Sequence, residues 1–205
     1  MPRVSVDQRE QYLQDRREHI LDASIEVFGS RGFSRTNVAD IAQTAGVAKG
    51  TVYLYFDSKE AIFNTILAER SFISRLTSLE LNEHMPLEAT LTTIAEDYYR
   101  YMQKDLCLFR LVLTDAHHFP EHSRQVYQEI VLKGSQILAT YLSALSEAGK
   151  IRKLDAPLLT AQAYMGMLNA HVITQEILGG KLFTRIDTKD WIREVVQLFI
   201  EGVLP

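Results

Sequence analysis

The segment from Thr36 to Tyr53 constrains the fold of this 205-residue chain more than any other part of the sequence. Two short runs with helical spacing of apolar residues meet at Gly46, where a residue without a Cβ atom lets the chain reverse closely. Ala42 is small where the two helices have to cross. The apolar residues that can fill the wedge between them are Ile41, Val47 and Val52. These features predict a helix-turn-helix, a unit that places its second helix in the major groove of DNA.

Helical patterns continue on both sides of this segment. Before it, the spacing predicts one amphipathic helix that ends at Gly32. The residues on its buried face are Leu13, Ile20, Ser24, Val27 and Phe28. Thr36 is expected to cap the next helix. After the segment, Asp57 and Glu60 have the spacing of a capping box, which predicts a long fourth helix that runs on to Leu79.

The rest of the chain is also predicted to be helical. The expected helices cover residues 87–102, 105–116, about 121–148, 157–178 and 188–203, and Thr188 is expected to cap the last one. Only five prolines and ten glycines interrupt the chain, and no segment makes a persuasive strand. The predicted fold is therefore all-α with about nine helices, in which a three-helix helix-turn-helix domain is followed by six further helices.

Composition bounds the class of protein but does not favour a nucleic-acid partner. Hydrophobic residues make up 46% of the chain and charged residues 23%, which predicts a packed globular protein with a sizeable core. The single cysteine, Cys107, cannot form an internal disulfide. No apolar run approaches the roughly 20 residues needed to cross a bilayer, and no leader is evident, so we expect a cytoplasmic protein without membrane contact.

The distribution of charge decides whether DNA binding is physically reasonable. The net charge is -4, and residues 1–60 hold eight basic side chains against nine acidic ones. Because affinity for DNA depends largely on neutralised phosphates, this balance argues against a nucleic-acid binder. DNA binding by the predicted helix-turn-helix must therefore depend on where the cations lie and not on how many there are.

Candidate DNA contacts gather at the second helix of the motif. Gly50 and Thr51 leave room for close approach to the duplex, and Lys49 places a cation at the helix start, where the helix dipole also favours a phosphate. Further groups that could reach the sugar–phosphate backbone are the hydroxyls of Thr36, Tyr53 and Tyr55 and the ammonium of Lys59. Tyr53 could equally be a wedge residue that packs against the fourth helix.

Residues 17–63 resemble the TetR/AcrR family of transcriptional regulators. The most diagnostic stretch is Ala45–Phe56, followed by Ser58–Ala61, and the first helix and the turn at Gly32 and Phe33 also agree. Ala48, which the resemblance places at the start of the DNA-contacting segment, stands where the family often has serine. It forfeits a side-chain cap worth about 1 kcal/mol. The resemblance implies a sequence-specific regulator, most commonly a repressor that binds a palindromic operator in double-stranded DNA.

Beyond residue 63 the chain matches the family only in its pattern of long helices. The resemblance implies a DNA-binding domain over residues 1–62 and a ligand-binding and dimerisation domain over residues 63–205. The homodimer is expected to form through the last two helices. The candidate interface residues are Ala163, Gly166, Met167 and Ala170 on one helix and Trp191, Val195, Leu198 and Phe199 on the other. Alternatively, the stripe on the last helix packs only within its own protomer.

An inducer is also implied by the resemblance, and aromatic and methionine side chains suit a small, largely apolar one. The candidate pocket residues are Tyr98, Tyr101, Met102, Phe109, Leu113, His117, Tyr127, Met165, Asn169 and His171. Each of them could also be plain core. No cofactor is expected. His117, His118 and His122 do not share one helical face, which argues against a metal site.

Other classes of function fit the sequence less well or remain open beside this prediction. The sequence has no phosphate-cradling glycine loop, nucleophile motif or metal-ligand helix pair, so an enzyme is disfavoured. A helical interaction module that does not bind DNA is a more serious alternative. A ligand-dependent activator of the same family also stays open, because the sequence alone does not separate activation from repression.

Overall fold

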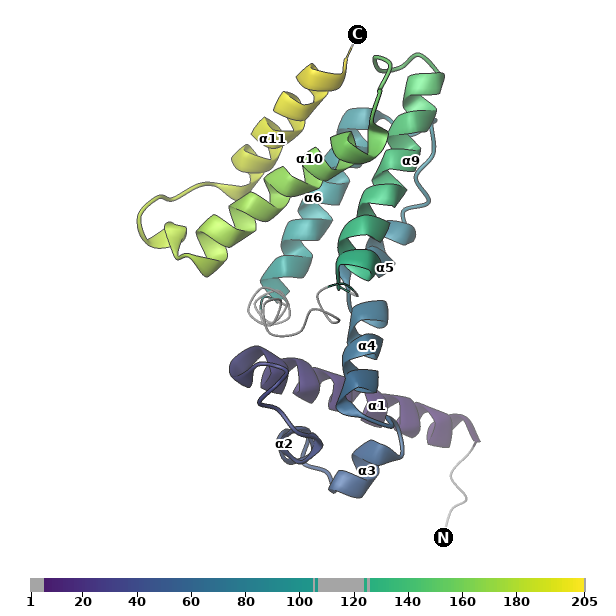
Figure 1. Ribbon diagram of the computed structural model, residues 1–205, viewed down its shortest axis with the longest axis vertical. Coiled ribbons are helices and arrows are strands. Elements are labelled where there is room, and N and C mark those ends of the chain that lie inside the picture. Colours follow the sequence, from purple (N-terminus) through teal and green to yellow (C-terminus); the bar gives the residue numbers. More distant parts are fainter. Residues whose placement is uncertain (1–5, 105, 107–123, 125, 205) are drawn as a thin grey trace. The chain divides into compact units, whose positions relative to one another are not determined.

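The computed structural model describes residues 6–104, 106, 124 and 126–204, and this part of the chain contains helices and no strand. The chain divides into two compact units, and the boundary between them falls after Arg70. Among the described residues, the first unit comprises residues 6–70 and the second begins at Ser71 (Figure 1). The predicted all-helical fold is confirmed. The first unit extends beyond the expected domain boundary at residue 62, because the fourth helix packs on the first.

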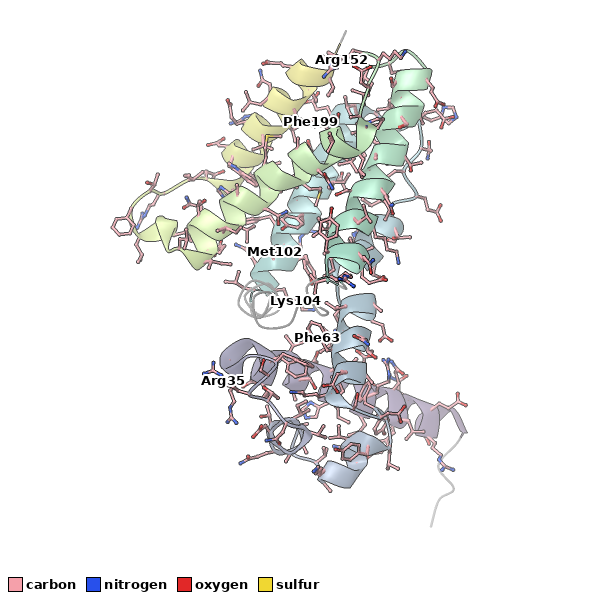
Figure 2. All side chains as sticks on the ribbon, in the orientation of Figure 1. Arg35, Phe63, Met102, Lys104, Arg152 and Phe199 are labelled. Atoms are coloured by element: carbon pink, nitrogen blue, oxygen red, sulfur yellow. The ribbon has the colours of Figure 1, made fainter. Side chains whose placement is uncertain are left out.

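Four helices build the first unit: α1 (Val6–Arg31), α2 (Val38–Thr44), α3 (Lys49–Tyr53) and α4 (Lys59–Glu69). Helix α1 packs on both α2 and α4, and α2 packs on α3. Three phenylalanine rings join α1, the α1–α2 loop and α4: Phe28 lies 5.2 Å from Phe33 and 6.2 Å from Phe63 between ring centroids. Phe63 projects from α4 into this cluster (Figure 2). Such aromatic contacts add about 0.5–1.5 kcal/mol per pair to the burial of apolar area.

The predicted helix caps are wrong by one residue at three helix starts. Helix α2 is capped by Asn37, whose side chain accepts hydrogen bonds from the amides of Ala39 and Asp40, while the neighbouring Thr36 is turned inward. Ser58 caps α4 and accepts from the Ala61 amide at 3.1 Å, in place of the expected Asp57. The third case is Asp187, which caps the last helix in place of Thr188.

The second unit contains longer helices around an apolar core. Its elements are α5 (Phe72–Thr77), α6 (Leu87–Lys104), the π-helix η1 (Tyr127–Leu132), α9 (Lys133–Glu147), α10 (Pro157–Val172), the π-helix η2 (Ile173–Ile177), the short 3-10 helix η3 (Gly180–Leu182) and α11 (Thr188–Val203). Helix α10 packs on α9, and α11 packs on α6 (Figure 1). Fully buried side chains between them include Leu91, Ile94, Tyr164 and Leu168.

Three sequence predictions need correction or lie beyond the described residues. The single helix expected from Lys59 to Leu79 is interrupted, because Arg70 leaves helical geometry and Ser71 begins a new helix. Leu13, expected on the buried face of α1, is 44% exposed. The helix expected over residues 105–116 lies mostly outside the described residues.

No helix in the described part of the chain has both the length and the apolarity needed to cross a membrane.

Candidate nucleic-acid interface and sensor core

The turn before α3 is built by the backbone of Gly46. Its φ angle of +60° lies in the left-handed region, which costs a residue with a side chain about 1–2 kcal/mol. A Cβ atom at this position would meet nothing within 4 Å, so the requirement for glycine comes from the backbone angle and not from space. Two hydrogen bonds close the turn: the amide of Gly46 donates to Gln43 at 3.1 Å, and that of Val47 donates to Ala42 at 2.9 Å.

Helix α3 is anchored by Val52, which is fully buried, while its other face is open. Lys49 and Gly50 are exposed, and Tyr53 is 47% exposed. The ammonium of Lys49 lies 5.8 Å from the ring centroid of Tyr53. A Cβ atom on Gly50 would meet nothing within 4 Å, so this face has a gap in which another molecule can approach the backbone. Of the predicted DNA contacts, the structure brings together Ala48, Lys49, Gly50, Thr51, Tyr53 and Tyr55.

Two predicted DNA contacts are turned into the protein. The Lys59 ammonium donates hydrogen bonds to the carbonyls of Phe33 at 2.9 Å and Thr36 at 3.0 Å. It also lies 4.4 Å from the Phe33 ring centroid, which favours a cation. The Thr36 hydroxyl donates to the Gly32 carbonyl at 2.8 Å, and the residue is 2% exposed. Lys59 and Thr36 therefore hold the α1–α2 loop against the start of α4.

Charged residues that the sequence analysis did not single out fasten α4 to α1. Arg17 donates two hydrogen bonds to the carboxylate of Glu69, at 2.7 and 2.6 Å. This pairing lowers the pKa of Glu69 below its usual value. Arg70 pairs with Glu18 and lies 3.3 Å from Asp22. Because the partners are far apart in the sequence, only the packing of α4 across α1 brings them together.

Several predicted pocket residues meet in the core of the second unit. Tyr98 on α6 is 5% exposed, donates a hydrogen bond to the side-chain carbonyl of Asn169 on α10, and packs edge-on against Phe72 at 5.2 Å. Burial raises the pKa of the Tyr98 phenol. Tyr101 lies 6.0 Å from the same Phe72 ring, and Met102 is buried near the end of α6 (Figure 2). The arrangement is an apolar cluster with one oriented polar pair.

The remaining pocket candidates do not all join this group. Met165 is half-buried on α10, and Tyr127 is 50% exposed. His171 is buried and stacks on Trp191, with ring centroids 3.8 Å apart. Burial lowers the pKa of His171, although the nearby carboxylate of Glu176 opposes this shift. Phe109, Leu113 and His117, as well as His118 and His122, lie outside the described residues.

The stripe predicted on the last helix faces two directions. Val195 and Phe199 are each 7% exposed, and the Phe199 ring lies 4.9 Å from Tyr164 on α10 (Figure 2). These two side chains therefore pack within their own protomer, as the alternative interpretation had it. Leu198 is 54% exposed, and Trp191 is half-buried against His171. On α10, the exposed candidates are Ala163, Gly166 and Ala170, whereas Met167 is half-buried.

A surface groove between α6 and α11 was not predicted from the sequence. It encloses about 700 Å³. Its lining residues are Glu88, Thr92 and Glu96 from α6, and Lys189, Ile192, Arg193, Val196, Gln197, Ile200 and Glu201 from α11. Charges of both signs surround the apolar residues, so the groove differs in chemistry from the apolar cluster around Tyr98.

Two family profiles match the chain, one in each compact unit. Residues 20–66 match the family described as bacterial regulatory proteins, tetR family. Residues 89–202, which make up more than half of the chain, match the family described as AefR-like transcriptional repressor, C-terminal domain. The first match contains the turn at Gly46 and all of α3, and the second contains the Tyr98–Asn169 pair.

Relatives and solved structures are similar to the chain over most of its length. The fatty acid metabolism regulator protein of Bacillus subtilis (strain 168) is 28% identical over 186 residues, covering 90% of this chain and 93% of the relative. The structure of the transcriptional regulator FadR from Bacillus subtilis in complex with stearoyl-CoA aligns with a TM-score of 0.73 and 24% identity, over 90% of this chain and 98% of that chain. FadR from Bacillus halodurans aligns with a TM-score of 0.70 and 24% identity, over 90% and 94%. At such identities the structures show a shared fold.

Proposed function

The chain belongs to the TetR family of transcriptional regulators, and from this premise we propose that it is a homodimeric repressor that leaves a palindromic operator when it binds a small, largely apolar ligand. As a family member it is a DNA-binding transcriptional regulator and not an enzyme. The observation that carries the proposal is the open face of α3, where Lys49, Gly50 and Thr51 stand beside the exposed Tyr53. We place its action in the cytoplasm, the compartment that holds bacterial operators.

Dimerisation follows from the small size of the reading helix. Helix α3 has five residues, and one such helix buries too little surface for specific affinity. Two copies related by a two-fold axis would read two half-sites about one helical turn apart. In support of an interface on α10 and α11, Leu198 is 54% exposed and α10 presents a face of small exposed residues. The match to a repressor C-terminal domain favours repression over activation.

The ligand that we propose is a long-chain acyl thioester. A relative similar over 90% of the chain is named a fatty acid metabolism regulator, and a structural neighbour contains stearoyl-CoA. The apolar side chains around Tyr98, Met102 and Phe72 suit an acyl chain. The side-chain oxygen of Asn169 accepts from Tyr98, so its amide N–H groups are the donors that suit the thioester carbonyl. In some conformations of the dimer, the distance between the two α3 helices does not match the two half-sites. A ligand that binds such a conformation more tightly than the operator-binding one weakens operator binding by the ratio of its two affinities.

Selection of bound fragments from the host genome tests the DNA-binding part of the proposal. The wild-type protein should protect two half-sites with two-fold symmetry in a footprint. Lys49→Ala should weaken binding to the selected fragment by about tenfold without changing the folded state, since this side chain is exposed. A protein that selects no fragment at low ionic strength, or whose footprint has no symmetry, contradicts this part.

The dimer is tested by placing one charge on the proposed interface. Leu198→Glu should shift the protein toward a monomer in sedimentation velocity at micromolar concentration, because an unpaired carboxylate is costly in an apolar contact. Gln136→Glu, which adds one charge on the exposed side of α9, is the matched control and should leave the mass unchanged. An unaltered dimer in Leu198→Glu would place the interface elsewhere.

Operator release tests the ligand class. Stearoyl-CoA should lower the affinity for the selected fragment, whereas coenzyme A alone should have little effect because it lacks the acyl chain. Free stearate separates recognition of the chain from recognition of the thioester. In a reconstituted transcription assay the protein should repress the selected promoter, and stearoyl-CoA should relieve the repression. Stimulation of transcription by the liganded protein would favour the activator instead.

A further inference from the structure

One face of α1 carries a row of cationic and aromatic side chains. Arg9, Tyr12, Arg16 and His19 follow one another at intervals of three or four residues, which places them on the same side of the helix. We call these four residues the α1 strip. Tyr12 is 58% exposed, Arg9 and His19 are exposed, and Arg16 is half-buried. The strip therefore faces outward from the first unit, whereas Phe28 lies on the buried side of α1.

The α1 strip lies beside the residues that flank α3. The His19 imidazole nitrogen Nε2 is 3.1 Å from the carbonyl oxygen of Ala45, which ends α2 at the turn of the helix-turn-helix. Next to His19 on the same face, the guanidinium of Arg16 donates to the Tyr12 hydroxyl, and this hydrogen bond raises the pKa of Arg16. The strip is thus connected to the end of α2, which leads through the turn at Gly46 into α3.

Arg16 is oriented by Tyr12 but not neutralised. Its guanidinium donates to the Tyr12 hydroxyl at 2.8 Å and lies 5.4 Å from the centre of the Tyr12 ring. Within the described part of the chain, Arg16 and Arg9 form no ion pair, whereas Arg17, Arg31 and Arg70 are paired with carboxylates. A guanidinium has five N–H donors, so Arg16 keeps donors for a further partner. Some arginines of the first unit therefore pair with carboxylates within the protein, whereas the Arg16 guanidinium can bind a further acceptor.

A small hollow marks the position where such a partner could sit. It encloses about 140 Å³ and is lined by Tyr12, Asp15, Arg16 and His19. The one acidic residue of this group, Asp15, accepts a hydrogen bond from the side chain of Gln11 at 2.7 Å. The Arg16 guanidinium and the Tyr12 hydroxyl are donors of the kind that bind phosphate oxygens in protein–DNA complexes, whereas His19 Nε2 is engaged by the Ala45 carbonyl.

We propose that the α1 strip forms a second DNA-contacting surface, in which Arg9, Tyr12 and Arg16 bind the sugar–phosphate backbone of the duplex that α3 reads and His19 holds the strip against the end of α2. The inference rests on the proposed operator binding and adds residues to it. It accounts for DNA binding by a chain whose first 60 residues carry more acidic than basic side chains, because Arg9 and Arg16, two cations without an ion pair in the described part of the chain, lie on one face of α1. It also replaces the phosphate contact expected from Lys59, whose ammonium is bonded within the protein.

The test measures how affinity for DNA depends on salt. Wild-type protein, Arg16→Gln, Arg9→Gln and Lys153→Gln are titrated over a range of KCl concentrations against the genome-selected fragment and against a mixed-sequence duplex of equal length. Arg16→Gln should weaken both interactions by about three- to tenfold and reduce the slope of log affinity against log salt by about 1, as expected for one lost phosphate contact. Circular dichroism should show an unchanged fold.

Matched controls separate a local contact from a change of net charge. Lys153→Gln removes one exposed positive charge from the second unit and should leave the slope unchanged. Arg9→Gln should reduce the slope in the same direction as Arg16→Gln. The inference is overturned if Arg16→Gln and Arg9→Gln both keep the wild-type slope, or if Lys153→Gln reduces the slope as much as they do. If Lys49→Ala also leaves affinity and slope unchanged, the proposed DNA binding by α3 has failed, which is a different result.

Discussion

The two compact units place their polar groups differently. In the first unit, charged side chains fasten the helices: Arg17 binds Glu69, and the Lys59 ammonium binds two loop carbonyls. In the second unit, phenol hydroxyls do this inside the core: Tyr164 donates to the Leu91 carbonyl at 2.6 Å, and Tyr98 donates to Asn169. A surface that meets a polyanion benefits from positioned cations, and a core that takes up an apolar ligand benefits from a few oriented polar groups.

The largest expected effect tests whether the two units are independent. Phe28→Ala removes a fully buried ring from the aromatic cluster of the first unit and should cost about 3–5 kcal/mol of unfolding free energy. Trp191 is the only tryptophan and stacks on His171 in the second unit, so its fluorescence reports on that unit. In denaturant, circular dichroism should show an earlier transition than fluorescence does. Leu168→Ala is the matched control in the second unit and should shift the fluorescence transition.

Coincident transitions in Phe28→Ala would mean that the units unfold as one body. The contrast between them would then be one of chemistry only, without separate stability. The same measurement on wild-type protein sets the baseline for this comparison.

A pair of lysine variants sharpens the contrast between a structural and a functional cation. Lys59→Met should cost about 1.5–3 kcal/mol of unfolding free energy, because the carbonyls of Phe33 and Thr36 lose a charged donor. Lys49→Met should change stability by less than about 0.5 kcal/mol, since Lys49 is exposed. Only Lys49→Met should reduce the salt dependence of DNA binding in the folded protein. The assignment fails if the two variants exchange these effects.

The polar pair of the second unit is expected to have a smaller effect. Tyr98→Phe removes the donor to Asn169 and should cost about 1 kcal/mol, because Asn169 is half-buried and water can reach it in part. A double-mutant cycle with Asn169→Leu should recover much of this loss, since neither partner is then left unsatisfied. Additive effects in the cycle would show that the two side chains do not interact.

The smallest effect concerns pH. Burial lowers the pKa of His171, so the folded protein prefers the neutral ring while the unfolded chain takes up a proton near the usual value of 6.5. Stability should therefore be full above about pH 6.5 and fall as the pH is lowered below it, with a slope under about 1.4 kcal/mol per pH unit for one proton. His171→Phe should flatten this dependence in urea titrations, whereas His84→Gln, at an exposed position, should not. An unchanged slope in His171→Phe would remove His171 from the cause.

Short-range patterns in the sequence predicted the helices well, and long-range contacts account for the errors. Two polar residues stand side by side at each mispredicted cap, and the loop geometry selects between them: at α2 the inward hydrogen bond of Thr36 leaves Asn37 as the cap. The role of Lys59 depends on carbonyls 26 and 23 residues away, which no local pattern reveals.

Periodicity has a similar limit in the second unit. It predicts that α11 has an apolar face, but it does not say which molecule covers that face. Phe199 packs on Tyr164 in its own protomer, whereas Leu198 on the same helix remains exposed. The side chains that α3 exposes could be predicted because they depend on consecutive residues from Lys49 to Tyr53 and on one turn.

Gly50→Leu tests the function of the open face of α3 most directly. The space around a Cβ atom at this position is empty, and the Gly50 φ angle is not positive, so the folded protein accepts the larger side chain. Unfolding free energy should stay constant or rise by up to about 1 kcal/mol, because leucine favours helix more than glycine does. Affinity for the selected operator fragment should fall by more than about tenfold, because the side chain blocks approach to the duplex. Wild-type affinity in a fully folded Gly50→Leu protein would contradict the assignment of α3 as the DNA-reading helix.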